Sequence, residues 1–138
     1  MGNFRELVVW QKGLDLTDTI YNLTEHFPKQ EMFGLSSQLQ WAAVSIPANI
    51  AEGHGRDSTK DYLRHLSYSR GSLTEVETLL EIAKRRDYLT AVQAEAATRQ
   101  CQEIDKMLRS MQVALRKKVV DEDNRRRVKP APEDGMPF

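Results

Sequence analysis

The chain has 138 residues, of which 40% are hydrophobic and 29% charged, with 20 basic residues balanced by 20 acidic ones. That length and composition fit one soluble domain with a tail, and the zero net charge argues against a dedicated nucleic-acid binder. Cys101 is the only cysteine, which excludes an intramolecular disulfide. No stretch approaches eighteen unbroken apolar residues and no signal peptide is evident, so we expect a cytoplasmic protein without a membrane span.

Apolar residues recur at alternating steps of four and three in four successive segments. This spacing places side chains on one face of an α-helix, and it predicts four amphipathic helices. The four stripes are Trp10, Leu14, Thr17, Tyr21 and Thr24; Leu35, Leu39, Ala42, Ile46 and Ile50; Tyr62, Leu66, Ser69, Leu73, Val76, Leu80 and Ala83; and Ala97, Cys101, Ile104, Leu108, Met111 and Leu115.

Residues with stop and cap chemistry separate the four stripes. Pro28 ends the first helix, Gly53 and Gly55 close the second, and Ser58 and Thr90 can cap the third and fourth. Connections this short join antiparallel neighbours, so we predict an all-α, up-down-up-down antiparallel four-helix bundle. Its expected core includes Leu14, Ile46, Leu73, Val76 and Ile104.

A proline and a polar segment interrupt this regular pattern. Pro47 lies inside the second helix, where it removes a backbone donor and should bend the helix. The bend either fits the curvature of the bundle or shapes a binding or subunit surface. From Val119 the sequence turns polar, and three prolines fall in its last nine residues. We therefore expect a bundle over residues 1–118 and a polar, Pro-rich C-terminal tail over residues 119–138.

Residues Phe4 to about Leu89 resemble a known bacterial family. These are the four-helix bundle proteins associated with intervening sequences in 23S ribosomal RNA genes, once labelled S23 ribosomal proteins. The pieces that carry the resemblance are Phe4-Arg-Glu-Leu-Val-Val-Trp-Gln-Lys, Phe27-Pro-Lys-Gln-Glu-Met-Phe-Gly-Leu, Ser37-Gln-Leu, Ala43-Val-Ser-Ile-Pro-Ala-Asn-Ile-Ala-Glu-Gly and Gly71-Ser-Leu-Thr-Glu-Val-Glu-Thr.

The resemblance implies a four-helix bundle that assembles into a ring, typically a homopentamer. It also implies a relationship to the accessory variability determinant proteins of diversity-generating retroelements, which work with a reverse transcriptase and nucleic acid. Neither group is known as an enzyme in its own right. This chain departs from the family at Gln40 and Trp41, where two basic residues usually stand. Since such charges attract phosphates, their absence weakens the case for RNA binding.

Basic residues are expected to gather near one end of the bundle. In a ring, such a patch would be repeated about the axis, so a neutral protein could still present a positive surface to nucleic acid. The ordinary alternative is that lysine and arginine favour the last turn of a helix because of its dipole. The candidate nucleic-acid-binding residues are Arg56, Lys60, Arg64, Arg116, Lys117 and Lys118, with Arg5 nearby.

Trp41 and Tyr62 are the candidate subunit contacts, because large aromatic residues are enriched at protein–protein interfaces. Stacking of Trp41 on a base is the alternative. Asn49 and Glu52 lie three residues apart and are expected to form a network that caps the second helix. No acid, base or histidine spacing identifies a catalytic, cofactor or metal site.

Three functional hypotheses follow. The leading one is a non-enzymatic cytosolic scaffold or adaptor that forms a homopentameric ring, with itself, RNA, a nucleic-acid enzyme or another protein as partner. The second is direct binding of structured RNA through the basic patch, which predicts an affinity that falls steeply with salt. The third, an enzyme, would require a convergent set of perturbed acids or histidines that the spacing does not provide.

Overall fold

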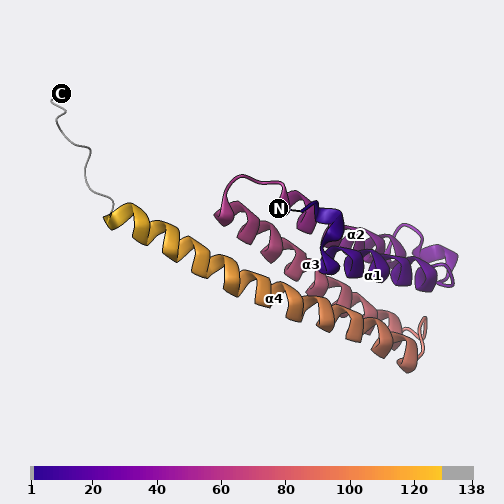
Figure 1. The fold of residues 1–138 in the computed structure, drawn as a ribbon. Coiled ribbons are helices and arrows are strands. Elements are labelled where there is room, and N and C mark those ends of the chain that lie inside the picture. Colours follow the sequence, from indigo (N-terminus) through magenta and orange to yellow (C-terminus); the bar gives the residue numbers. More distant parts are fainter. Residues whose placement is uncertain (1, 129–138) are drawn as a thin grey trace, which may run out of the picture.

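The computed structural model describes residues 2–128, and this part of the chain is helical without strands. Two short 3-10 helices, η1 and η2, precede the first and second long helices. In chain order the elements are η1 (Phe4–Glu6), α1 (Val8–Thr24), η2 (Lys29–Glu31), α2 (Leu35–His54), α3 (Thr59–Arg85) and α4 (Ala91–Val128). The predicted all-α class is confirmed (Figure 1).

Each long helix packs against its neighbour in the sequence, and α4 returns to pack against α1. The order around the bundle is therefore α1, α2, α3, α4, with consecutive helices antiparallel (Figure 1). This is the predicted up-down-up-down four-helix bundle. None of the helices described here is long and apolar enough to cross a membrane.

The predicted caps of α3 and α4 are both present. The Ser58 hydroxyl accepts a hydrogen bond from the backbone N–H of Asp61 at 3.3 Å. At the start of α4, the Thr90 hydroxyl accepts from the N–H of Gln93, while the Gln93 side chain accepts from the N–H of Thr90. Both helices thus begin where the sequence places a side chain that satisfies a free backbone donor.

Four of the five predicted core residues are buried: Ile46, Leu73, Val76 and Ile104. Leu14 is the exception, because 39% of its surface is exposed. The buried stripe of α1 consists of Val9, Gly13, Leu16, Ile20 and Thr24. Its first four members lie one position earlier than predicted, and Thr24 was predicted correctly. One residue turns the helix by about 100°, so Leu14 faces outward.

Gly13 belongs to this buried stripe because Pro47 of α2 packs against it. A Cβ atom at residue 13 would lie 3.2 Å from the Pro47 Cβ, so α1 and α2 approach closely here and a side chain at residue 13 would require a small shift. Pro47 has no N–H to donate to the carbonyl of Ala43. The Thr17 hydroxyl lies 3.3 Å from that oxygen and can donate to it instead. Pro47 therefore packs α2 against α1 within the same bundle.

α4 continues as a helix to Val128, ten residues beyond the predicted boundary at residue 118. Residues 119–128 are helical because the first proline after residue 118 is Pro130 and nothing earlier stops the helix. The division into a bundle and a tail at residue 118 stays a prediction. The remaining tail residues, 129–138, lie outside the described part of the chain. α4 has 38 residues and α3 has 27, so α4 extends past its neighbour (Figure 1).

Candidate interaction surfaces

An aromatic and aliphatic surface lies on the outer side of α1 and α2. Trp41 is 75% exposed, and with Tyr21, Gln40 and Val44 it lines a shallow groove of about 250 Å³. The buried stripe of α2 includes Leu39, Ala42 and Ile46, which turns the indole of Trp41 toward solvent. We call this surface the Trp41 face; it consists of Tyr21, Trp41 and Val44, together with the exposed Leu14, which lies two turns before Tyr21 on the same side of α1. Exposed apolar clusters of this kind mark interaction sites in soluble proteins.

Gln40 and Trp41, which replace the family's usual basic pair, have different environments. The Gln40 amide donates to the Thr24 hydroxyl at 3.0 Å, so this half-buried side chain joins α2 to α1. Only position 41 is directed outward. A charge at this position would be available to a partner, and this chain presents an indole there instead.

Tyr62, the second predicted subunit contact, is half-buried within its own bundle. Its ring packs edge-on against His54 with centroids 5.9 Å apart, and its Cδ1 atom would lie 2.9 Å from a Cβ at Gly53. Burial raises the pKa of the Tyr62 hydroxyl. These contacts join α2 to α3, and an interface role for Tyr62 remains a prediction.

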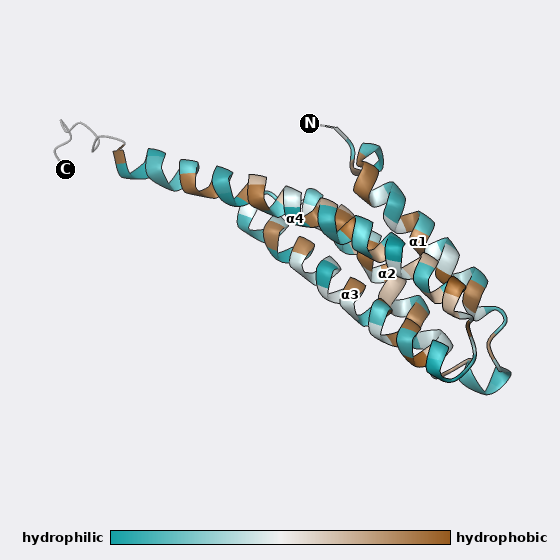
Figure 2. Cartoon of the chain, turned by 90° about the horizontal axis from the view of Figure 1, so that it is seen from below, coloured by the Kyte–Doolittle hydropathy of each residue, from teal (hydrophilic) through white to brown (hydrophobic). Residues whose placement is uncertain are grey.

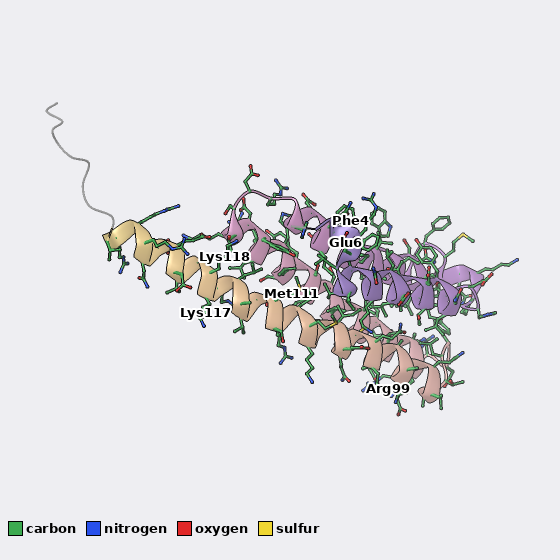
Figure 3. All side chains as sticks on the ribbon, viewed as in Figure 1. Phe4, Glu6, Arg99, Met111, Lys117 and Lys118 are labelled. Carbon is green, nitrogen blue, oxygen red and sulfur yellow. The ribbon has the colours of Figure 1, made fainter. Side chains whose placement is uncertain are left out.

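The predicted basic residues are only partly brought together. Lys60 and Lys118 line one groove of about 480 Å³ between the start of α3 and α4, together with Arg126. The same groove is lined by the acidic residues Asp57, Glu122 and Asp123, so its charge is mixed. Lys117 and Lys118 project to different sides of α4 (Figure 3), as consecutive helical residues must.

Two of the predicted nucleic-acid-binding arginines form ion pairs within the subunit. Arg56 pairs with Glu52 at 2.6 Å, and Arg64 lies 3.4 Å from Asp61. Both pairs are exposed on the surface. Arg116 and Lys117 are exposed on α4. The residues thus form a region of mixed charge rather than a uniformly positive patch. The far part of α4 is mainly hydrophilic (Figure 2).

Asn49 and Glu52 do not form the network that we expected. The Asn49 amide donates to the Ser45 carbonyl, and its oxygen lies 3.1 Å from Nδ1 of His65 on α3. Glu52 pairs with Arg56 instead. Asn49 therefore links α2 to α3, and Glu52 belongs to the exposed surface.

A polar network between α3 and α4 was missed by the sequence analysis. Arg70 donates to Asp105 at 2.7 Å and to Gln112 at 3.0 Å, and Gln112 donates to the Ser67 hydroxyl at 2.9 Å. Gln112 is only 1% exposed. Helical spacing marks Met111 as an inward position, and no pattern in the sequence distinguishes its neighbour Gln112 as the buried residue.

Charges in this network shift nearby pKa values in opposite directions. Burial would raise the pKa of Asp105, but hydrogen bonds from Arg70 and Arg109 outweigh burial and hold it below the usual value. Burial, and then the charge of Asp105, raise the pKa of Glu77. Burial also raises the pKa of the Cys101 thiol to about 12. Within residues 2–128, no three His, Cys, Asp or Glu side chains converge as metal ligands.

Comparison with known proteins places this bundle in a family. Residues 5–110 match the model of the 23S rRNA-intervening sequence proteins. The chain belongs to this family. A crystal structure of a protein of unknown function from the S23 ribosomal protein family of Bacteroides thetaiotaomicron is similar in sequence and fold. It is 32% identical, superposes with a TM-score of 0.71, and the match covers 76% of this chain and 98% of that one. No curated protein matches the chain.

Proposed function

We propose that this 23S rRNA-intervening sequence family protein is a non-enzymatic scaffold or adaptor that assembles into a homopentameric ring. The Trp41 face is the single observation that carries the proposal. It places an indole, a phenol and two aliphatic side chains on one exposed side of the bundle. Tryptophan and tyrosine provide much of the binding energy in protein interfaces, and a second copy of the chain is the partner that is always present.

The chemistry-bearing side chains of the bundle support a structural role. Glu31 accepts from the Tyr88 hydroxyl at 2.9 Å and from the backbone N–H of Leu35 at 3.2 Å. His65 is paired with Asn49, and the Ser69 hydroxyl donates to the Ile46 carbonyl. Each of these groups joins two elements of the same fold, so they act as connectors between helices.

Binding of structured RNA is the second candidate function. The observation that favours it is the groove in which Lys60 and Lys118 lie together beside Arg126. A ring would repeat this groove about its axis and increase its attraction for phosphates. The three acidic residues of the same groove oppose that attraction, and for this reason we rank RNA binding after the scaffold role.

Native mass spectrometry of the protein, purified at low salt without nuclease, tests both functions. We expect a mass of five subunits for the wild type and smaller species for Trp41→Ala. Tyr68→Ala is the matched control, because Tyr68 is a large aromatic side chain, 52% exposed, on α3 rather than on α1 or α2. A monomeric wild type would refute the ring.

A nuclease-sensitive addition to the mass would instead support RNA binding. In that case the affinity should fall steeply as salt rises, and Lys60→Glu with Lys118→Glu should weaken it. A clean five-subunit mass whose stability hardly responds to salt would leave the protein scaffold as the better description.

A further inference from the structure

The start of α1 and the middle of α4 enclose an apolar groove of about 460 Å³. Its walls are residues 7–9 and, from α4, Lys106, Met107, Ser110 and Met111. We call it the methionine groove. Met111 lies on the stretch of α4 that passes the first residues of the chain, where Phe4 and Glu6 are labelled (Figure 3). Methionine side chains adapt their shape and make favourable contacts with aromatic rings, so this groove suits an aromatic side chain.

The methionine groove offers room for a large side chain of a neighbouring copy. Trp41 is the most exposed side chain of the Trp41 face. Both surfaces are mainly apolar, so burying one against the other removes apolar area from water on both sides. An aromatic side chain that fills a pocket is the usual centre of a stable interface.

The charges beside the two surfaces are complementary. Asp18 and Glu25 are exposed on α1, three residues before and four residues after Tyr21, so they lie along the Trp41 face. The methionine groove carries the ammonium group of Lys106. Pairing of two Trp41 faces would bring these carboxylates close to each other, which disfavours a two-fold contact. A contact between the face and the groove brings opposite charges together.

The positions of the two surfaces in the bundle determine what such a contact builds. The Trp41 face lies on α1 and α2, and the groove lies on α1 and α4, so they occupy adjacent sides of one bundle. Copies joined through opposite sides of the bundle would form a straight row. Copies joined through adjacent sides are each rotated relative to the previous one, and such an assembly can close into a ring. Tyr21 is near the end of α1 and the groove is at its start, so bundles joined in this way are inclined to the ring axis.

We propose that Trp41 of one copy inserts into the methionine groove of the next copy, with Asp18 close to Lys106. This inference rests on the ring proposed above and names its two contact surfaces. It describes a head-to-tail interface, in which every copy contributes one face and one groove.

Cysteine cross-linking tests this pairing without removing Trp41. Val44→Cys introduces a thiol on the Trp41 face, and Ser110→Cys introduces one in the groove. The native Cys101 thiol is buried with a pKa of about 12, so the wild type should not react. With a short bis-maleimide, we expect a mixture of the two variants to give a covalent dimer, and the chain carrying both substitutions to give a ladder of higher multimers.

A charge exchange provides a second measurement on exposed residues. Asp18→Lys and Lys106→Glu should each weaken the oligomer at least tenfold in dissociation constant, and their combination should recover most of that loss. Asp15→Lys serves as the control for Asp18→Lys, because Asp15 is an exposed acid of the same helix.

The outcomes separate the pairing from the ring. Efficient cross-linking of Val44→Cys with itself would overturn the head-to-tail contact in favour of a two-fold one. A five-subunit wild type with neither the mixed cross-link nor recovery in the charge exchange would refute the pairing and leave the ring intact. A monomeric wild type would refute the proposed function and this inference together.

Discussion

Three glycines of the bundle allow its packing to be tested by one and the same substitution. A Cβ atom at Gly53 would lie 2.7 Å from the His65 Cβ and 2.9 Å from the Tyr62 Cδ1, so α2 and α3 approach closely at this point. At Gly13 the nearest atom would be the Pro47 Cβ, at 3.2 Å. At Gly71, on the exposed side of α3, nothing lies within 4 Å.

Alanine stabilises a helix relative to glycine by about 0.5–1 kcal/mol, and overpacking a core costs about 1–3 kcal/mol. For Gly53→Ala the shortest contact is with the His65 Cβ, which cannot move without α3, so the upper part of that range applies. We therefore expect Gly53→Ala to lower the free energy of unfolding by about 1–2 kcal/mol. Gly71→Ala should raise it by about 0.5–1 kcal/mol, and Gly13→Ala should fall between them.

Urea unfolding followed by far-ultraviolet circular dichroism, at one fixed protein concentration, measures this order. The concentration must be fixed because an oligomer's stability depends on it. Gly71→Ala is the matched control, since it makes the same chemical change in a helix without the contact. A Gly53→Ala variant as stable as Gly71→Ala would refute the close packing of α2 against α3.

Three further predictions concern the contact between α3 and α4. Gln112→Leu should lower the free energy of unfolding by about 1–3 kcal/mol, because it removes the hydrogen bonds of this buried amide with the Arg70 guanidinium and the Ser67 hydroxyl. Gln102→Leu, at an exposed position of the same helix, should have little effect. Asp105 has a pKa below its unfolded value of 3.8, so its stabilising contribution is complete above that pH and is lost as the pH falls through the lower folded-state pKa. The stability difference between wild type and Asp105→Asn, measured by urea unfolding, should therefore shrink as the pH falls below about 4; a constant difference would contradict the pairing with Arg70 and Arg109. Cys101 should react with a thiol reagent at least a hundredfold more slowly in the native protein than in denaturant, and equal rates would contradict its burial.

The fold was predictable from the sequence because its signals are local and agree with one another. Ser58 and Thr90 have the chemistry of helix caps, and the structure uses both as caps. The stripes of α2 and α3 identify buried residues such as Ile46 and Leu73. α1 is different, because its inward face includes Gly13, which is buried to fit Pro47. A search for stripes of large apolar residues overlooks a buried glycine, because the reason for its small size lies on another helix.

The candidate surfaces were less predictable, because they depend on which helices face each other. Trp41 was identified from its type and position, yet the sequence could not show that Gln40 is tied to Thr24 while Trp41 points outward. Arg56 and Arg64 were grouped with Lys60 as phosphate-seeking residues. Their ion pairs with Glu52 and Asp61 follow from helical spacing and could have been foreseen from it. The mixed-charge groove could not have been foreseen, because it depends on which residues of α4 lie beside the start of α3.

The two kinds of surface lie at different places on the bundle, which has a consequence for function. The Trp41 face and the methionine groove are apolar and lie along α1, whereas the mixed-charge groove lies between the start of α3 and the far part of α4. Assembly through the Trp41 face and the methionine groove would leave the mixed-charge groove, and the end of α4 beyond it, accessible on every copy. A scaffold needs this separation, since the contacts that build the ring must not consume those that recruit a partner. Assembly and recruitment should therefore be separable by substitution, with Trp41→Ala affecting the first and Lys60→Glu with Lys118→Glu affecting only the second.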